Sequence, residues 1–544
     1  MKKYVIGIDY GTLSARAVLI ELDSGCEIAE SVYEYPHAVM TYADFGISTN
    51  ADTALQHPSD YIDALSFTVR EITEKASVDA KDILGIGIDF TSSTIMPVLS
   101  DGTPMCLIEK YKNNPHAYVK LWKHHGANKE ADDMTQAAIK CNQSWLSDFG
   151  GKVSSEWMLP KILESKRNSA ELYNETCRFI EAGEWVATTL TGSDFRSSCM
   201  AGYKTQWSKD KGYPSKEFFA EFGEDFSDII GTKISENILP TGSKAGEVCE
   251  RGNKLCGLAE GTAVSVPIID AHATLPGSGV VESGKLMLIV GTSCCHIILS
   301  EKDRKIDGIF GKVLDGVIPG YYAYEAGQSC VGDMFDHFIK NYVPEKYSVE
   351  AREAGINLFD LLTEKASRLE VGENKLLALD WWTGNRSPYS DFDLSGVIVG
   401  LTLSTKSEDI FRALLESCAF GTKVIVDNFE KSGIEVNELY ACGGIAKKNP
   451  LFMQIMADVL GKSVRVTGEE QAAAKGSAIL AAYACGYYNT IKDAANKMCN
   501  SKDTIFTPVS SHHEKYKLLY EEYRTLSEYF ARSGNNVMKK LKNL

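Results

Sequence analysis

A short turn near the start of the chain combines residue types suited to binding a polyphosphate. Asp9 and Thr12 lie beside Gly7 and Gly11, two glycines that let a ligand approach the backbone. Successive backbone N–H groups in such a turn can form a concave binding site for an anion. A carboxylate cannot bind phosphate directly, so Asp9 suggests a Mg²⁺ ion between itself and the phosphates, because Mg²⁺ prefers oxygen ligands.

The same pattern returns about half a chain later. Residues 286–299 again predict a strand, a turn of small residues at Gly291, Thr292 and Ser293, and a second strand. One such turn alone is more often structural. Two copies at this separation predict a duplicated fold in which each half offers one hairpin to the phosphates of a nucleotide.

A carboxylate at the end of a buried strand is the candidate for proton transfer. Residues 262–269 form an apolar run that ends at Asp270, shortly before the second hairpin. Burial raises the pKa of such a carboxyl group and makes it a competent proton acceptor, here for a hydroxyl next to the transferred phosphate. The alternative is that Asp270 is the N-cap of the helix that follows.

Two further polar residues lie in surroundings that suit ligand binding. Lys204 follows Gly202 between aromatic residues, where a lysine needs an anionic or hydroxyl-bearing partner. Glu325 lies close to Gly327 in a tyrosine-rich stretch and can bind hydroxyl groups. For both residues an exposed surface position is the competing interpretation.

A glycine pair late in the chain suits the nucleoside part of a ligand. Gly443 and Gly444 follow a short predicted strand and let an adenine or ribose lie against bare backbone. Asn449 and Pro450 have the types preferred at the N-cap and first position of the next helix.

Strands and helices must position these residues. Hairpins are predicted at 4–20 and 286–299, and a buried strand at 83–88 ends in a polar cluster, 89–94, which is either a ligand site or a capped turn. We interpret Trp122, Trp157 and Trp185 as packing residues. The pairs His124-His125 and His512-His513 are interpreted as surface histidines.

Bulk properties exclude several classes of protein. With 544 residues, 44% of them hydrophobic, two domains of about 250 residues are expected. A net charge of -16 argues against nucleic acid or an anionic membrane as a partner. The chain has no signal-peptide core and no apolar run of ~18 residues, so we expect a cytoplasmic protein. Its 14 cysteines are scattered without a CxxC pair, which favours reduced thiols.

These motifs, in their order along nearly the whole chain, resemble the FGGY carbohydrate kinases of the actin, hexokinase and heat-shock chaperone ATPase superfamily. Within that family, four strings are similar to the kinases that act on L-ribulose. They occupy residues 121–125, 150–157, 201–204 and 325–329.

The resemblance implies an α/β fold. It comprises two RNase H-like domains, as in actin-like ATPases, each with a mixed five-stranded sheet flanked by helices, and a cleft between them. Residues 1–280 would form the N-terminal, sugar-binding domain, and residues 281–544 the C-terminal, nucleotide-binding domain.

The resemblance also implies roles for individual residues. Asp270 would be the general base that takes a proton from the C5 hydroxyl of the sugar. The remaining implied contacts are Lys204, Glu325 and the backbone near Met96 for the sugar, Asp9 for Mg²⁺, Asp9, Gly11, Thr12, Gly291 and Thr292 for the phosphates, and Gly443, Gly444 and Asn449 for the nucleotide.

The implied function is ATP- and Mg²⁺-dependent phosphorylation of L-ribulose to L-ribulose 5-phosphate in L-arabinose catabolism. The partners would be the sugar and ATP, and a homodimer is compatible with the resemblance. One alternative is a kinase for another ketopentose or polyol, such as D-ribulose, xylulose or glycerol. Another is an actin-like or chaperone-like ATPase without a sugar acceptor, which is disfavoured because no peptide-binding β domain follows the nucleotide half.

Overall fold

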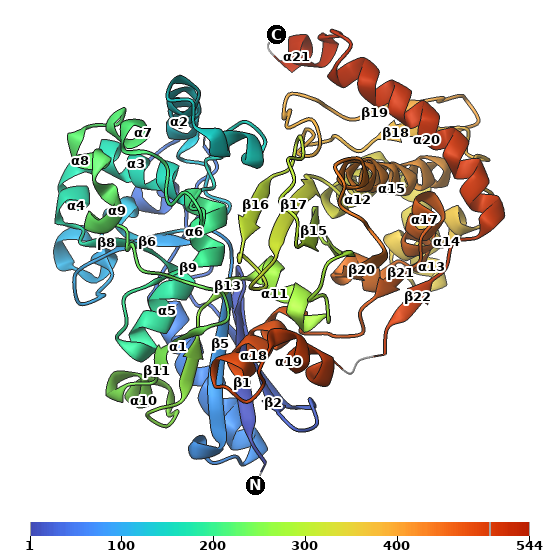
Figure 1. Cartoon of the computed structure of the whole chain (residues 1–544). Coiled ribbons are helices and arrows are strands. Elements are labelled where there is room, and N and C mark those ends of the chain that lie inside the picture. Colours follow the sequence, from blue (N-terminus) through green and yellow to red (C-terminus); the bar gives the residue numbers. More distant parts are fainter. Residues whose placement is uncertain (1, 50, 500–501, 543) are drawn as a thin grey trace. The chain divides into compact units, whose positions relative to one another are not determined.

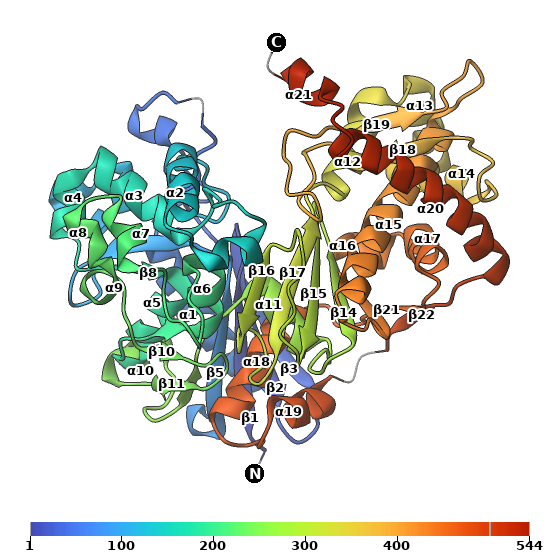
Figure 2. The same cartoon turned by 45° about the horizontal axis from the view of Figure 1, so that its top comes forward.

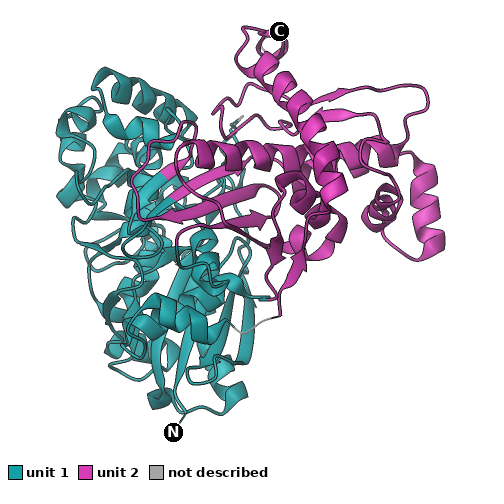
Figure 3. Ribbon diagram, turned by 45° about the vertical axis from the view of Figure 1, so that its right-hand side comes forward, with its two compact units in different colours: residues 1–282, 312–323, 469–501 teal, residues 283–311, 324–468, 502–544 magenta. Residues whose placement is uncertain are grey.

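The computed structural model describes residues 2–49, 51–499, 502–542 and 544, and these form two compact units (Figure 3). The first unit comprises Met1–Glu282, Lys312–Ala323 and Glu469–Ser501, and the second comprises Ser283–Gly311, Tyr324–Gly468 and Lys502–Leu544. The chain therefore enters the second unit close to the predicted boundary at 280/281. Two later segments nevertheless belong to the first unit.

A mixed sheet forms the centre of the first unit (Figure 1). Its strands run in the order β11-β12-β5-β1-β2-β3, and β13 also pairs with β5. The predicted hairpin at 4–20 is confirmed, because β1 and β2 are antiparallel neighbours, while β5 lies parallel to β1. The bounds are β1 Tyr4–Tyr10, β2 Ser14–Glu21, β3 Glu27–Glu34, β5 Ile83–Phe90, β11 Lys244–Glu247, β12 Ala263–Ser265 and β13 Ile268–Ile269.

A second mixed sheet forms the centre of the second unit, with strand order β17-β15-β14-β20-β21-β22. The predicted hairpin at 286–299 is confirmed by the antiparallel pair β14 and β15, and β20 lies parallel to β14. The bounds are β14 Lys285–Val290, β15 Cys294–Ser300, β17 Tyr322–Gln328, β20 Glu438–Cys442, β21 Val464–Val466 and β22 Thr504–Phe506.

The two sheets repeat one plan, as the two hairpins predict, but each is larger than five strands. In the first, β11 adds an antiparallel strand beyond β12; in the second, β22 does the same beyond β21. Pro267 follows β12 and has no N–H to donate, and the chain resumes pairing with β5 only at β13. The α/β fold class with two mixed sheets flanked by helices is confirmed.

Smaller strands complete the structure. A four-stranded sheet in the first unit has the order β4-β7-β6-β8, and β9 pairs with β10. In the second unit β18 pairs with β19. The bounds are β4 Leu55–Gln56, β6 Ile95–Val98, β7 Val119–Lys120, β8 Arg178–Glu181, β9 Arg196–Ser197, β10 Ile238–Leu239, β16 Gly311–Leu314, β18 Leu377–Leu379 and β19 Val397–Val399.

Helices flank both sheets (Figures 1 and 2). Those of the first unit are α1 Ser59–Ala76, α2 Asn128–Lys140, α3 Met158–Asn168, α4 Ala170–Glu175, α5 Ala182–Thr191, α6 Ser198–Thr205, α7 Lys216–Ala220, α8 Glu224–Ser227, α9 Ile229–Thr232, α10 Glu250–Cys256, α11 Asp270–Gly277, α18 Ala472–Ala484 and α19 Ile491–Met498. Those of the second unit are α12 Gly332–Tyr342, α13 Glu345–Ala354, α14 Leu358–Ser367, α15 Ser407–Lys431, α16 Gly444–Lys448, α17 Pro450–Leu460, α20 Ser510–Ala531 and α21 Val537–Lys542. None of the helices among the described residues is long and apolar enough to cross a membrane.

The two faces of the first sheet are covered by helices from opposite ends of the sequence. Tyr10 packs edge-to-face against Tyr61 of α1. Gly7 lies an odd number of residues away on the same strand and so faces the other side, where α18 approaches. A Cβ atom on Gly7 would lie 1.8 Å from the backbone oxygen of Ala474, so only glycine fits. Gly7 thus serves helix packing, which corrects the prediction that it opens the backbone to a ligand.

Candidate active site

Three carboxylates gather at one edge of the first sheet. Asp9 and Asp89 are register partners near the carboxyl ends of the parallel strands β1 and β5. Asp270 directly follows β13, whose last residue, Ile269, pairs with Phe90 of β5. Ligands of open α/β sheets bind at this end of the strands. The structure therefore brings together the predicted metal ligand, the predicted base and a third carboxylate.

The third carboxylate, Asp89, is fully buried. Burial raises its pKa well above the usual range, and the neighbouring charges of Asp9 and Asp270 add to this shift. Burial also raises the pKa of Asp9, whereas a hydrogen bond with Asp89 opposes the increase. The Oγ atom of Ser477 on α18 donates to Asp89 Oδ2 at 2.6 Å. Like charges crowded in this way favour a divalent cation among them.

Asp270 is the first residue of α11. The N-cap is Ile269, so the alternative that Asp270 is itself the N-cap is wrong, although Asp270 Oδ1 accepts a hydrogen bond from the N–H of Ala271 at 2.7 Å. Two residues on, His272 is buried; its Nδ1 lies 3.1 Å from Cys199 Sγ, and its ring packs on that of Tyr203. These contacts join the start of α11 to α6, the helix that carries Lys204.

Thr12 in the phosphate turn is fixed by contacts from elsewhere in the first unit. Its Oγ1 accepts a hydrogen bond from Trp122 Nε1 at 3.1 Å, and its carbonyl accepts one from Gln56 Nε2 at 2.6 Å. Trp122 is 37% exposed, so its interpretation as a core packing residue is wrong. Gly11 closes the turn by donating to the carbonyl of Ser14 at 3.0 Å.

The predicted sugar contacts are divided between the units. Lys204 is half-buried in the last turn of α6, and Met96 is fully buried on β6 of the same unit. Glu181 lies on β8, where it is the register partner of Ile95, the neighbour of Met96 on β6. Burial raises the pKa of Glu181 to about 7, although the positive charge of Lys204 opposes the shift. Glu325 is half-buried on β17, in the second unit.

A buried polar network supports two loops of the first unit. Lys161 Nζ donates to the carbonyls of Ser93 and Leu121, each at 2.8 Å, and thereby ties the loop after β5 to the one that carries Trp122. Burial lowers the pKa of Lys161 to about 7. His124 Nε2 lies 3.1 Å from Glu164 Oε2 within the same network. His124 is fully buried, so its interpretation as a surface residue is wrong.

The second unit contains a cavity of about 530 Å³. The turn between β14 and β15 and residues at the starts of helices α12, α14 and α16 surround it. Its lining residues are Gly291, Thr292, Gly332, Asp333, Asn357, Phe359, Asp360, Gly444, Ile445 and Lys448. Backbone N–H groups and the positive ends of helix dipoles make such a place suited to phosphate.

The turn at Gly291 and Thr292 is bonded to the start of α12. The carbonyl of Thr292 accepts from the N–H of Val331 at 2.8 Å, and the carbonyl of Gly291 accepts from that of Gly332 at 3.1 Å. A Cβ atom on Gly332 would lie 2.7 Å from Gly291 O, so a side chain here would separate the two elements.

The glycine pair has two separate functions in the fold. Gly443 has φ +98°, and a Cβ atom there would lie 2.3 Å from Val290 O, which excludes other residues. Gly444 lines the cavity and has no atom within 4 Å of its Cβ position. Asn449 is buried and is the N-cap of α17, as predicted. Its Oδ1 accepts a hydrogen bond from the backbone N–H of Phe452 at 2.9 Å. Its side chain does not line the cavity.

Several lining residues were missed by sequence reasoning. Phe359 offers an aromatic ring, and Asp333 and Lys448 offer charges of opposite sign. One sequence signal could have identified these residues: Asn357 has the type preferred at a helix N-cap. In the structure its Oδ1 accepts a hydrogen bond from the backbone N–H of Asp360 at 2.8 Å. A helix start near the phosphate turn is a candidate anion site.

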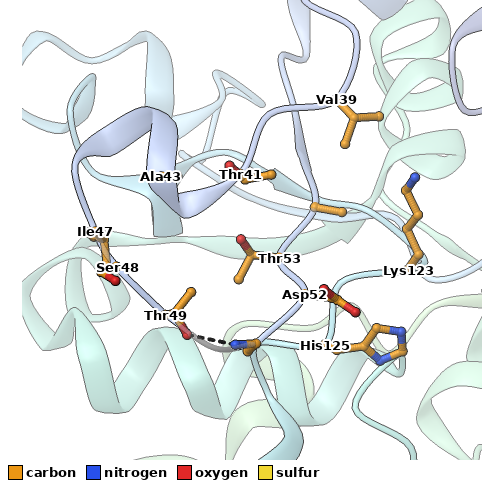
Figure 4. Close-up of a pocket in the computed structure, with 12 residues that line it drawn as sticks. Val39, Thr41, Ala43, Ile47, Ser48, Thr49, Asp52, Thr53, Lys123 and His125 are labelled. Carbon is orange, nitrogen blue, oxygen red and sulfur yellow. Dashed lines mark hydrogen bonds between the residues drawn. The ribbon is translucent and has the colours of Figure 1, made fainter.

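A further cavity of about 600 Å³ lies in the first unit (Figure 4). Ile47 and Ser48 lie on one side of it, and Lys123 and His125, next to Trp122, lie on the other. The residues in between include Thr41, Thr53 and Asp52.

Comparisons with known proteins agree with this architecture. Residues 286–485 match the family model described as the C-terminal domain of the FGGY family of carbohydrate kinases. The chain is 47% identical to a ribulokinase of Halalkalibacterium halodurans over 100% of this chain and 97% of that protein. It is 41% identical to a ribulokinase of Staphylococcus aureus over 99% of each chain.

Solved structures share the fold at low identity. A gluconate kinase from Lactobacillus acidophilus superposes with a TM-score of 0.80 at 19% identity, covering 98% of this chain and 99% of that one. A glycerol kinase from Plasmodium falciparum, solved with ADP, gives a TM-score of 0.76 at 17% identity, covering 96% and 98%. Full-length identity, rather than these superpositions, decides the family: the chain belongs to the FGGY carbohydrate kinases and, among them, to the ribulokinases.

Proposed function

We propose that this kinase transfers the γ-phosphoryl group of ATP to the C5 hydroxyl of L-ribulose, giving L-ribulose 5-phosphate for L-arabinose catabolism. The observation that carries the proposal is the grouping of Asp9, Asp89 and Asp270 at the carboxyl end of three neighbouring strand segments. A carboxylate base next to a second carboxylate that suits a metal ion is what phosphoryl transfer to an alcohol requires.

In the proposed reaction, Asp270 accepts the proton of the C5 hydroxyl while the hydroxyl oxygen attacks the γ-phosphorus. The bond from phosphorus to the bridging oxygen of ADP breaks, and the proton stays on Asp270. The contacts of α11 with Cys199 and Tyr203 hold Asp270 in place, which matters because the reaction depends mostly on positioning and electrostatics.

Mg²⁺ fits the carboxylate cluster because its preferred ligands are oxygen atoms and burial raises the pKa of both Asp9 and Asp89, so a bound cation would stabilise their charged forms. Asp9 would be its protein ligand. When bound, the ion neutralises charge on the phosphates. Thr12 on one unit and Thr292 on the other would donate to the phosphates. The N–H groups of Gly11 and Gly291 already donate to the carbonyls of Ser14 and Ser293, so these glycines would instead let the phosphates approach the backbone.

ATP would bind in the cavity of the second unit. Gly443 and Gly444 would lie along the nucleoside, and the starts of α12 and α14 would face the phosphates. Asn449 would act indirectly, by fixing the start of α17 relative to α16. Its backbone N–H donates to the carbonyl of Ile445 at 2.9 Å. The sugar would contact Lys204, Glu325 and the backbone near Met96. A cytoplasmic location and a homodimer stay predictions.

The substrate assignment can be tested by measuring ADP formation with MgATP and a panel of L-ribulose, D-ribulose, D-xylulose, L-xylulose and glycerol, with a control lacking sugar. We expect L-ribulose to give the highest kcat/KM, with ³¹P NMR locating the phosphate on C5. A different preferred sugar would reassign the substrate within the family. ATP turnover without any sugar would support the ATPase alternative instead.

The nucleotide assignment predicts the result of filling the cavity at Gly444. Leucine at this position meets no atom at its Cβ and extends into the cavity, so we expect Gly444→Leu to weaken ADP binding on the order of tenfold, about 1.4 kcal/mol. Calorimetric titration with ADP measures the effect. The urea midpoint serves as control and should not change; unchanged ADP affinity would place the nucleotide elsewhere.

A further inference from the structure

Two histidines and one aspartate converge between β3 and α1, and none of them belongs to the carboxylate cluster of the first unit or to the cavity of the second. His37 follows β3, and His57 and Asp60 lie where α1 begins. One potential ligand atom of each residue lies within 4.8 Å of the others, the one such group that the described part of the chain contains. The fold, rather than local sequence, brings His37 to the other two.

Asp60 is held in one orientation. Its side chain is buried, with Oδ1 at 2.6 Å from His37 Nδ1, and Oδ2 accepts a hydrogen bond from the backbone N–H of His37 at 3.2 Å. A carboxylate already fixed by a second contact is a typical supporting feature of metal sites. The His37 side chain is 48% exposed, so an ion has a path to the group from solvent.

His57 completes the group with a second imidazole. Its ring stacks on that of His37, with centroids 4.4 Å apart and planes at 19°, and the ring of Tyr118 packs against it at 5.7 Å. Its Nδ1 has only a long contact, 3.3 Å, from the N–H of Ser59.

We propose that His37, His57 and Asp60 bind one divalent transition-metal ion, with Zn²⁺ as the best match. Two imidazole nitrogens and one carboxylate oxygen suit Zn²⁺ and its neighbours in the first transition series, whereas Mg²⁺ prefers an all-oxygen set. The ligand atoms are close enough to surround one ion after a small rotation of the half-exposed His37. The site thus differs in chemistry from the proposed Mg²⁺ site at Asp9.

The ion would close a loop. His37 and His57 flank the segment that contributes Val39, Thr41 and the residues from Ala51 to Ala54 to the cavity of about 600 Å³ (Figure 4). Fixing both ends of this segment lowers the number of conformations open to the cavity wall. The proposed ion is therefore structural for this wall, and it is not needed for the phosphoryl-transfer step.

Titration of the metal-stripped protein with Co²⁺, in excess Mg²⁺, tests the proposal. We expect one equivalent to bind and to give visible d–d absorption, and Zn²⁺ to displace it. His37→Ala and His57→Ala should each weaken Co²⁺ binding at least 100-fold. His337→Ala is the matched control, because His337 is an exposed histidine of the second unit, and it should bind Co²⁺ as the unmodified protein does.

The Co²⁺ titration distinguishes a metal site from a simple ion pair between His37 and Asp60, because only a metal site gives d–d absorption. His37 is half-exposed, so its replacement by alanine should leave the fold intact, which circular dichroism checks. Absence of d–d absorption at Co²⁺ concentrations up to 100 times that of the protein would overturn the proposal. So would Co²⁺ binding of unchanged strength in both His37→Ala and His57→Ala.

Discussion

Replacing Asp270 with asparagine is expected to lower kcat by about 10³-fold, the usual contribution of a general base. Asparagine has nearly the same shape and its Oδ1 can still accept from the N–H of Ala271, so α11 should begin as before. It cannot take up the proton of the C5 hydroxyl. We therefore expect the affinity for ADP, bound in the other unit, to change less than twofold. Steady-state kinetics and calorimetry measure the two quantities.

The control for this variant is the same substitution at an exposed aspartate. Asp132→Asn on α2 removes one carboxylate far from any proposed role and should leave kcat within twofold. Near-normal turnover in Asp270→Asn would remove Asp270 as the base. Asp89 is buried beside Asp9, and it would then be the next carboxylate to examine.

Adding one methyl group to Gly476 is expected to lower the free energy of unfolding by about 3 kcal/mol. A Cβ atom there would lie 1.8 Å from the backbone oxygen of Ala273, and backbone cannot move aside as a flexible side chain can. The contact is reciprocal, because a Cβ atom on Gly277 would lie 1.8 Å from Ala472 O. Urea denaturation of Gly476→Ala measures the loss.

Gly444→Ala is the matched control for stability. It adds the same methyl group where nothing lies within 4 Å, so the free energy of unfolding should change by less than about 0.5 kcal/mol. A comparable small loss in Gly476→Ala would mean that α11 and α18 can separate at little cost. Because Asp270 begins α11, the same variant should also lose activity if it folds.

The elements of the fold that depend on local pattern could be predicted from sequence. Alternating apolar residues and small turn residues identify both hairpins, and the helix signals at Asn449 and Pro450 predict the start of α17. The role of Gly7 could not be predicted, because it depends on Ala474, more than 460 positions away. The extra edge strands β11 and β22 are short, and a run of three or four residues carries little periodicity.

The candidate site likewise contains residues whose position could be predicted from local sequence and residues whose position could not. Asp270 follows a buried apolar run, so its place at a strand end could be inferred. Trp122 and His124 are neighbours, yet one is partly exposed against Thr12 and the other is buried against Glu164. The residue types alone could not predict either environment, because the partners Thr12 and Glu164 come from distant segments of the chain. The lining of the nucleotide cavity was missed for the same reason.

The course of the chain through the two units limits how the protein can be divided. A fragment that stops at Glu282 would keep β1, β5 and α11 but lack α18, whose backbone packs directly against Gly7, Gly87 and Gly277. Ser477 would also be missing beside Asp89. A stand-alone version of the first unit would therefore have to carry the late helix, either joined by a new linker or supplied as a separate complementing peptide.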